Sequence, residues 1–124
     1  MEYQTGETLS YERSFTTEDV ERFAEVSRDE GAHHTTADED GTLVVHGLLT
    51  ATLPTKLGGD IDFLARTMEF EFHRPVYTGQ TVRCELTLDE VTEREDRYDV
   101  AGTYVCTVDG DVVMRGESDG VVTK

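Results

Sequence analysis

The first third of the chain shows a short strand pattern followed by a helical pattern. Residues 8–15 contain the β-tolerant residues of a short strand. Thr16 then supplies a hydroxyl cap, and the two acids that soon follow suit the positive end of a helix. From Val20 onward apolar residues recur at a spacing of about 3.6. We therefore predict a helix that ends near Arg28.

The middle of the chain predicts a loop and then a buried helix. Residues 30–41 contain glycines, histidines, threonines and acids with no periodicity of either kind. Residues 47–57 are mostly apolar or small, which is too long a run for an ordinary strand, and Gly58 follows as a helix stop. Pro54 lies inside this run, so we expect a kink or a local loss of hydrogen bonds there.

The second half of the chain has the alternation of β-strands. Residues 68–72 alternate strictly, and Pro75 ends that strand or places it at an edge. Asp109 and Gly110 form a strong hairpin signal. We therefore predict four consecutive antiparallel strands, which span residues 68–72, 82–91, 98–107 and 112–122.

This order of elements predicts an α+β fold in one domain that covers residues 1–124. A helix that is apolar on most faces needs cover on most sides, and an antiparallel sheet with one apolar face can wrap around it. That arrangement is the hot-dog fold. Because such a sheet leaves an edge strand, we also expect a homodimer or a higher homo-oligomer.

The charge of the chain limits the classes of partner that it is expected to bind. The formal net charge is −16, and lysine occurs only as Lys56 and Lys124. Nucleic acid and anionic membranes both require clustered basic residues, so we expect neither as a partner. The acids are dispersed rather than gathered in a tail, and with scarce lysine they favour a protein of a high-salt cytoplasm, where charge repulsion is screened.

Targeting and redox signals are few. The first ten residues are polar, and no apolar run approaches the roughly 18 residues that a membrane span needs. We therefore expect a cytoplasmic protein. Cys84 and Cys106 lie in strand-like segments without metal-ligand spacing, so we expect them to be reduced, buried and small apolar fillers.

Two neighbouring segments contain the residues suited to chemistry. Asp29 and His34 are five residues apart just after the first predicted helix. Two adjacent titratable groups of different type are suited to acid and base catalysis. Gly47 follows at the start of the second helix, where a backbone N–H can bind a developing negative charge and a side chain would block close approach.

These segments resemble the MaoC-type dehydratases of the (R)-specific enoyl-CoA hydratase family. That family has the pattern S-G-D-x-N-P-x-H after its first helix, V-H-G at the start of its central helix, and R-P-V-x-x-G-D before a long strand. The chain reads SRDEGAHH at 27–34, VHG at 45–47 and RPVYTGQ at 74–80. The resemblance covers nearly the whole chain. Departures from the pattern are Arg28, Gly31, Ala32 and Thr36, and a short loop between His34 and His46.

The resemblance implies a hydro-lyase that acts on acyl thioesters, by reversible hydration of a trans-2-enoyl-CoA to the (R)-3-hydroxyacyl-CoA. It implies that Asp29 and His34 hold the water that adds to the double bond. It also places Thr55, further along the central helix, near the thioester. No cofactor is implied. Since acyl-CoA is a polyanion, we expect a local cluster among the arginines of this acidic chain.

Other interpretations of the same residues are less favoured. His33 is expected to be a loop neighbour, His46 to shape the entry to the helix, and His73 has no matching partner. A metal site among Asp29, the histidines and Asp38 lacks the usual spacings, so we expect none. Two other functions stay open: a hot-dog thioesterase, whose carboxylate activates water toward the carbonyl, and a non-catalytic acyl-CoA-binding or partner subunit.

Overall fold

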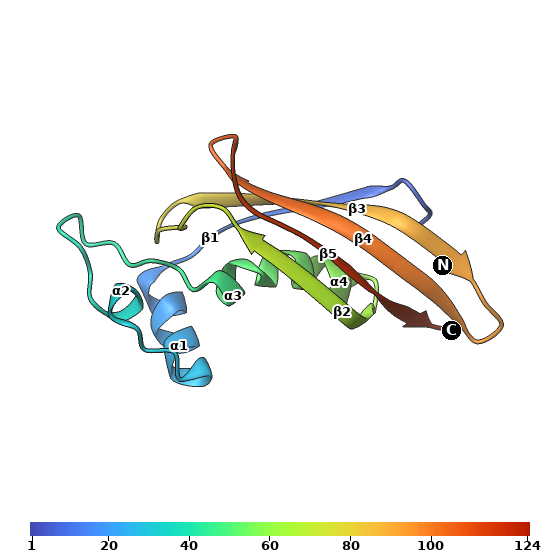
Figure 1. Ribbon diagram of the computed structural model, residues 1–124, viewed down its shortest axis with the longest axis horizontal. Coiled ribbons are helices and arrows are strands. Elements are labelled where there is room, and N and C mark those ends of the chain that lie inside the picture. The colour runs from blue at the N-terminus through green and yellow to red at the C-terminus, as the bar shows by residue number, and fades with distance from the viewer.

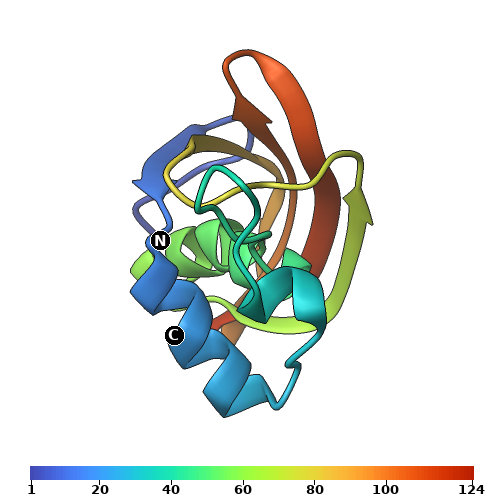
Figure 2. The ribbon, with the colours of Figure 1, turned by 90° about the vertical axis from the view of Figure 1, so that its left-hand side faces the viewer.

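The computed structural model describes all 124 residues and places every strand in one antiparallel sheet. The sheet has the order β1-β3-β4-β5-β2. Its strands are β1 (Thr8–Ser14), β2 (Leu64–Phe72), β3 (Thr81–Glu93), β4 (Arg97–Val108) and β5 (Asp111–Thr123). Figure 1 shows this sheet lying over the central helices, and Figure 2 shows it curving around them. The predicted α+β fold, a sheet wrapped around a central helix, is confirmed.

The first helix begins as the sequence predicts. In α1 (Thr17–Ser27) the Thr16 side chain accepts from the Asp19 N–H, and the Asp19 side chain accepts from the Thr16 N–H. This reciprocal pair satisfies two backbone donors that a helix start leaves free. The hydrogen bond from the Thr16 N–H also lowers the pKa of the Asp19 carboxyl. The chain leaves the helix at Arg28, whose φ of 65° turns it sharply.

The central helix is broken into α3 (Gly47–Thr50) and α4 (Thr52–Asp60). The break at Ala51 lies one turn before Pro54, which has no N–H for the Thr50 carbonyl and whose ring crowds that group. The expected local disruption of the helix is therefore present, but it lies upstream of the proline. The expected stop at Gly58 is wrong, because the helix continues to Asp60, where an ion pair from Lys56 supports its last turn.

Two other boundaries differ from the predictions. The loop at residues 30–41 contains a one-turn helix, α2 (Ala32–Thr35), which is too short to show periodicity. Strand β2 begins at Leu64, four residues before its strict alternation starts. This strand pairs with β5 rather than with the next strand in sequence, so it forms a sheet edge. Asp109 and Gly110 both have positive φ, as the predicted hairpin requires.

The core lies between the inner face of the sheet and the central helices. Leu53 and Leu57 of α4 pack into it with apolar side chains from the three central strands. Cys84 and Cys106 are free thiols, fully buried, and directly opposite each other on β3 and β4. Their burial as free thiols confirms both as small core fillers. A hydrogen bond with the Cys106 thiol, followed by burial, raises the pKa of Cys84. None of the helices has the length and apolar character needed to cross a bilayer.

The outer face of the sheet contains a pair of like charges. Glu69 of β2 lies directly opposite Glu117 of β5. The hydrogen bond that these carboxyls share, followed by their like charge, raises the pKa of Glu117. A raised carboxyl pKa means that the folded state binds this proton more tightly than the unfolded state does. The pair therefore destabilises the fold progressively as pH rises from the usual glutamate range through the raised pKa.

We predict that Glu117→Gln raises the melting temperature at pH 7 by about 1 to 3 °C in dilute buffer. The gain should disappear below the usual pKa of glutamate and shrink in molar salt, because either condition removes the repulsion. Glu71→Gln is the matched control, since Glu71 lies opposite Arg115 on the same two strands. Thermal melts decide the matter, and equal gains from both variants would contradict the assignment.

Candidate active site

The Asp29 carboxylate is oriented by its own loop. Arg28 adopts the left-handed conformation, which glycine favours, at the position where the resembled family has glycine. The Asp29 N–H then donates to Ser27 Oγ at 3.1 Å, and the Gly31 N–H donates to Asp29 Oδ1 at 3.3 Å. These local hydrogen bonds hold one carboxylate oxygen against the backbone and leave Oδ2 facing the site.

His34 is buried on α2 and points its other nitrogen at this carboxylate. Its Nδ1 lies 2.6 Å from the Val44 carbonyl oxygen, which can only accept, so Nδ1 carries the hydrogen. In the neutral ring Nε2 is then an acceptor. It lies 3.8 Å from Asp29 Oδ2, which is too long for a direct hydrogen bond. Two acceptors face each other across a gap that a water molecule can bridge by donating to both.

His46 supports both of these residues. It is 2% exposed, and its Nε2 donates to the backbone carbonyl of Asp29 at 2.9 Å. Its ring stacks on His34 with centroids 3.7 Å apart and an interplanar angle of 13°. Phe23 of α1 packs against the same ring. His46 therefore fixes the Asp29 loop and gives His34 a flat support, which agrees with its expected structural role.

The geometry disfavours one metal ion shared by Asp29, His34 and His46, although their ligand atoms lie within 4.8 Å of one another. Imidazole lone pairs lie in the ring plane, and two stacked rings direct them along nearly parallel planes that do not converge. Asp38 is not available to such a site, because its carboxylate accepts hydrogen bonds from Thr42 within its own loop. These hydrogen bonds lower the pKa of the Asp38 carboxyl. The absence of a metal stays a prediction.

Gly47 lies where the central helix begins beside these residues. It is the first residue of α3, so no carbonyl within the helix can accept its N–H. A Cβ at this position would approach Phe72 Cε1 to 2.8 Å. Any larger residue would therefore push the Phe72 ring of the edge strand aside, a reason for glycine that the sequence pattern did not indicate. The segment before Gly47 is anchored by the Val45 N–H, which donates to the Val76 carbonyl at 2.7 Å.

These groups line one open cavity of about 640 Å³ between α1, α2, the start of α3 and the end of β2. Its walls include all four histidines of the chain. Asp29 is the only acid in its lining, and Arg74 is the only arginine or lysine. The structure thus brings Asp29, His34 and Gly47 together, as the sequence predicts. Phe72, His73 and Arg74 were missed as lining residues, although Arg74 begins the R-P-V motif and the other two come directly before it.

Thr55 lies apart from these residues. Its hydroxyl donates to the Thr52 carbonyl at 3.0 Å. It lines a second, mostly apolar cavity of about 130 Å³ between α4 and the inner face of the sheet. Different residues of β2 line the two cavities, with Phe72 in the first and Met68 in the second. The structure therefore does not place Thr55 with Asp29, His34 and Gly47.

Comparison with known proteins supports the fold. No protein-family model matches the chain. The chain is 35% identical over 82 residues to the 3-hydroxyacyl-[acyl-carrier-protein] dehydratase FabZ of Roseiflexus castenholzii, a match that covers 62% of this chain and 54% of that protein. The match thus spans only about half the length of that curated relative.

Two solved structures show the same architecture. The (R)-hydratase from A. caviae involved in PHA biosynthesis superimposes with a TM-score of 0.82 at 23% identity, over 95% of this chain and 96% of that chain. The MaoC-like dehydratase from Rhodospirillum rubrum superimposes with a TM-score of 0.76 at 18% identity, over 98% of this chain and 94% of that chain. The chain therefore has the hot-dog fold.

We predict that His46→Gln lowers the free energy of unfolding by about 1 to 3 kcal/mol, because a buried hydrogen bond and a stacked ring are both disturbed. Urea unfolding measures this change. His33→Gln is the control on the exposed neighbouring histidine and should change stability by less than about 0.5 kcal/mol. Abolition of the pH dependence of turnover by His46→Gln in a folded protein would instead make His46 a proton-transfer group.

Proposed function

We propose that the protein is a hydro-lyase that acts on acyl thioesters, by reversible hydration of a trans-2-enoyl-CoA to the (R)-3-hydroxyacyl-CoA. The observation that carries this proposal is the pair of facing acceptors, Asp29 Oδ2 and His34 Nε2, 3.8 Å apart. A water held between them has one hydrogen bound on each side and its lone pair directed outward. Several of the similar proteins are named as hydratases or dehydratases, which supports the same reaction.

In the proposed reaction the pair takes a proton from the water as the water oxygen bonds to the β-carbon. The electrons of the carbon–carbon double bond move toward the thioester, whose oxygen becomes enolate-like. The Gly47 N–H, free at the start of α3, donates a hydrogen bond to that oxygen. A proton from the same pair then reaches the α-carbon, so that one water has been added across the double bond. Dehydration is the reverse.

The first prediction from this reaction is that Asp29→Asn and His34→Ala each lower turnover by about 100-fold or more, the scale for a positioned acid or base. The assay follows enoyl absorbance and free thiol together. Loss of enoyl absorbance indicates a hydratase, release of thiol indicates a thioesterase, and neither indicates a binding subunit. Glu30→Gln is the control, since Glu30 is an exposed carboxylate of the same loop that does not line the cavity. Turnover that survives both substitutions would remove the catalytic assignment.

A second prediction concerns Gly47. Gly47→Val should lower kcat by about 100- to 1,000-fold, because the displaced amide binds charge that develops only in the transition state. The double variant Gly47→Ala/Phe72→Ala tests the packing separately. It removes the Phe72 ring, which the new Cβ at position 47 would otherwise meet. Gly59→Ala is the matched control on α4, where a Cβ has open space. Full activity of Gly47→Val would refute the role of the amide.

Self-association is a further part of the proposal. The edge strand β2 exposes Leu64, Met68 and Phe72, which are 68%, 41% and 53% exposed. A free strand edge with apolar side chains favours pairing with another copy. One similar structure is a complex, the (3R)-hydroxyacyl-ACP dehydratase HadBC of Mycobacterium tuberculosis, with a TM-score of 0.72 at 19% identity over 97% of this chain and 98% of that chain. We infer a homodimer, which sedimentation can measure.

We also propose that the acidic surface is an adaptation to a salt-rich cytoplasm. With a net charge of −16, the fold is expected to lose stability as salt is lowered. Repulsion then acts over about 10 Å at 0.1 M instead of about 3 Å at 1 M. Thermal melts across potassium chloride concentrations measure this. A melting temperature that is flat, or highest in dilute buffer, would contradict the adaptation.

A further inference from the structure

A phosphate-bearing acyl carrier must approach a strongly acidic molecule. The chain has 27 acidic residues against 11 lysines and arginines. The lining of the Asp29 cavity differs from this average, because it contains one acid, one arginine and the four histidines. The field of the whole chain repels an anionic ligand, and the lining of this cavity adds little to that repulsion, because Arg74 offsets the charge of Asp29. Any group that binds the carrier is therefore best sought in this lining.

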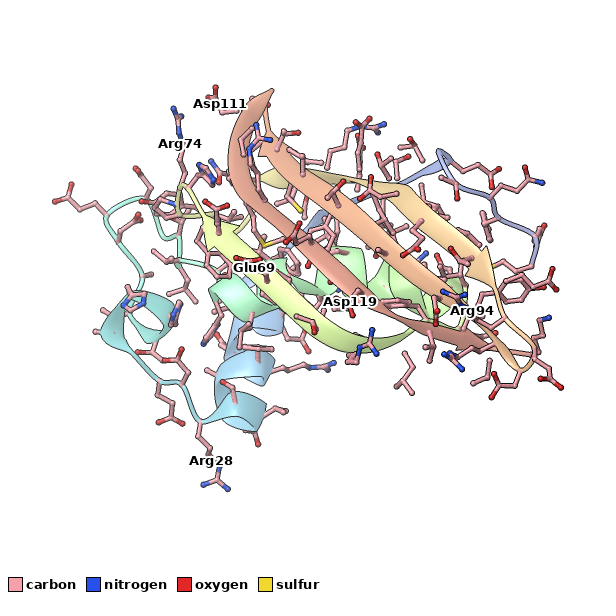
Figure 3. All side chains as sticks on the ribbon, turned by 45° about the vertical axis from the view of Figure 1, so that its right-hand side comes forward. Arg28, Glu69, Arg74, Arg94, Asp111 and Asp119 are labelled. Atoms are coloured by element: carbon pink, nitrogen blue, oxygen red, sulfur yellow. The ribbon has the colours of Figure 1, made fainter.

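The expected cluster of arginines is not present at the site. Seven arginines have a carboxylate partner within ion-pair distance: Arg13, Arg22, Arg66, Arg74, Arg83, Arg94 and Arg97. Of the other two, Arg28 extends away from the body of the protein (Figure 3), and Arg115 lies opposite Glu71 in the β2–β5 ladder. Only Arg74 lines the cavity. Arg74 is therefore the only residue of the lining that has a permanent positive charge.

The backbone of Arg74 is fixed and its side chain is free to exchange partners. The N–H groups of His73 and Arg74 both donate to the Val113 carbonyl, at 2.8 and 3.3 Å. Pro75 follows and restricts the chain further. The guanidinium lies 3.2 Å from Asp111 Oδ2, and both side chains are more than half exposed. Figure 3 shows this pair at the edge of the molecule. An exposed ion pair of this kind contributes little, so an anion can displace Asp111.

We propose that Arg74 binds the phosphate of the carrier to which the acyl thioester is attached. This inference rests on the proposed function. The shared chemistry is the phosphate next to the pantetheine arm, which occurs both in coenzyme A and in the prosthetic group of a carrier protein. A guanidinium binds such a group through two parallel N–H···O hydrogen bonds. Asp111 competes for the same guanidinium and weakens this binding.

The test compares three carriers of one short trans-2-enoyl thioester: coenzyme A, 4′-phosphopantetheine and pantetheine, which has no phosphate. The readout is the ratio of kcat/KM for each phosphorylated carrier to that for pantetheine. Arg74→Gln should lower this ratio about three- to tenfold, the scale of a partly exposed charged hydrogen bond. Asp111→Asn should raise it, because Arg74 loses its competing partner.

Arg94→Gln is the matched control, since it removes the same charge from an arginine that also pairs with an aspartate. Figure 3 shows Arg94 at the other end of the sheet from Arg74. Arg94→Gln should leave the ratio of kcat/KM values unchanged. Equal effects of Arg74→Gln and Arg94→Gln, or no effect of Arg74→Gln, would overturn the proposal while leaving the hydration reaction in place.

The three carriers also separate the sources of the phosphate. An effect on both phosphorylated carriers assigns the contact to the phosphate beside pantetheine. An effect on coenzyme A alone overturns that assignment in favour of its nucleotide phosphates. Failure of the unaltered protein to hydrate any of the three would refute the proposed function, and the role of Arg74 in it would fall with it.

Discussion

The site depends on two hydrogen bonds from imidazoles to backbone carbonyls. His34 reaches the Val44 carbonyl, and His46 reaches the Asp29 carbonyl. Each bond joins the loop after α1 to the segment before α3, and the stacked rings join the two bonds to each other. A carbonyl can only accept, so these bonds also decide which nitrogen of each ring carries its hydrogen. The same contacts that hold the two segments together thus leave His34 Nε2 as an acceptor facing Asp29.

Most of the fold follows from local patterns. Thr16 and Asp19 form a capping box that is visible in the sequence, and Asp109 with Gly110 occupies a turn that few other pairs tolerate. The errors occur where tertiary structure decides. Glycine is a poor helix former. Gly58 nevertheless stays helical, because it is buried where α4 packs against the sheet. Strand β2 pairs with β5, a long-range choice that no pattern within residues 64–72 reveals.

The candidate site was predictable in its residue types and positions but not in its geometry. Spacing and the resemblance place Asp29 and His34 on one loop and Gly47 at a helix start. The 3.8 Å gap between two acceptors follows from the Val44 carbonyl, which lies ten residues from His34 and has no side-chain signature. Arg74 enters the lining because β2 ends beside α3. Thr55 was predicted near the site but does not lie there, since the helix break at Ala51 separates the two.

Strand β2 connects the chemistry to the expected self-association. Its inner side directs Phe72 against Gly47, where a Cβ would crowd the end of the ring, and the ring is half exposed. Residues of this strand line both cavities, and the same strand offers the free edge of the sheet. A second copy paired with β2 would therefore cover Phe72 and hold it against the start of α3. Pairing of this kind would make the Gly47 amide more rigid and the cavity drier, which strengthens the hydrogen bond that the proposed reaction requires.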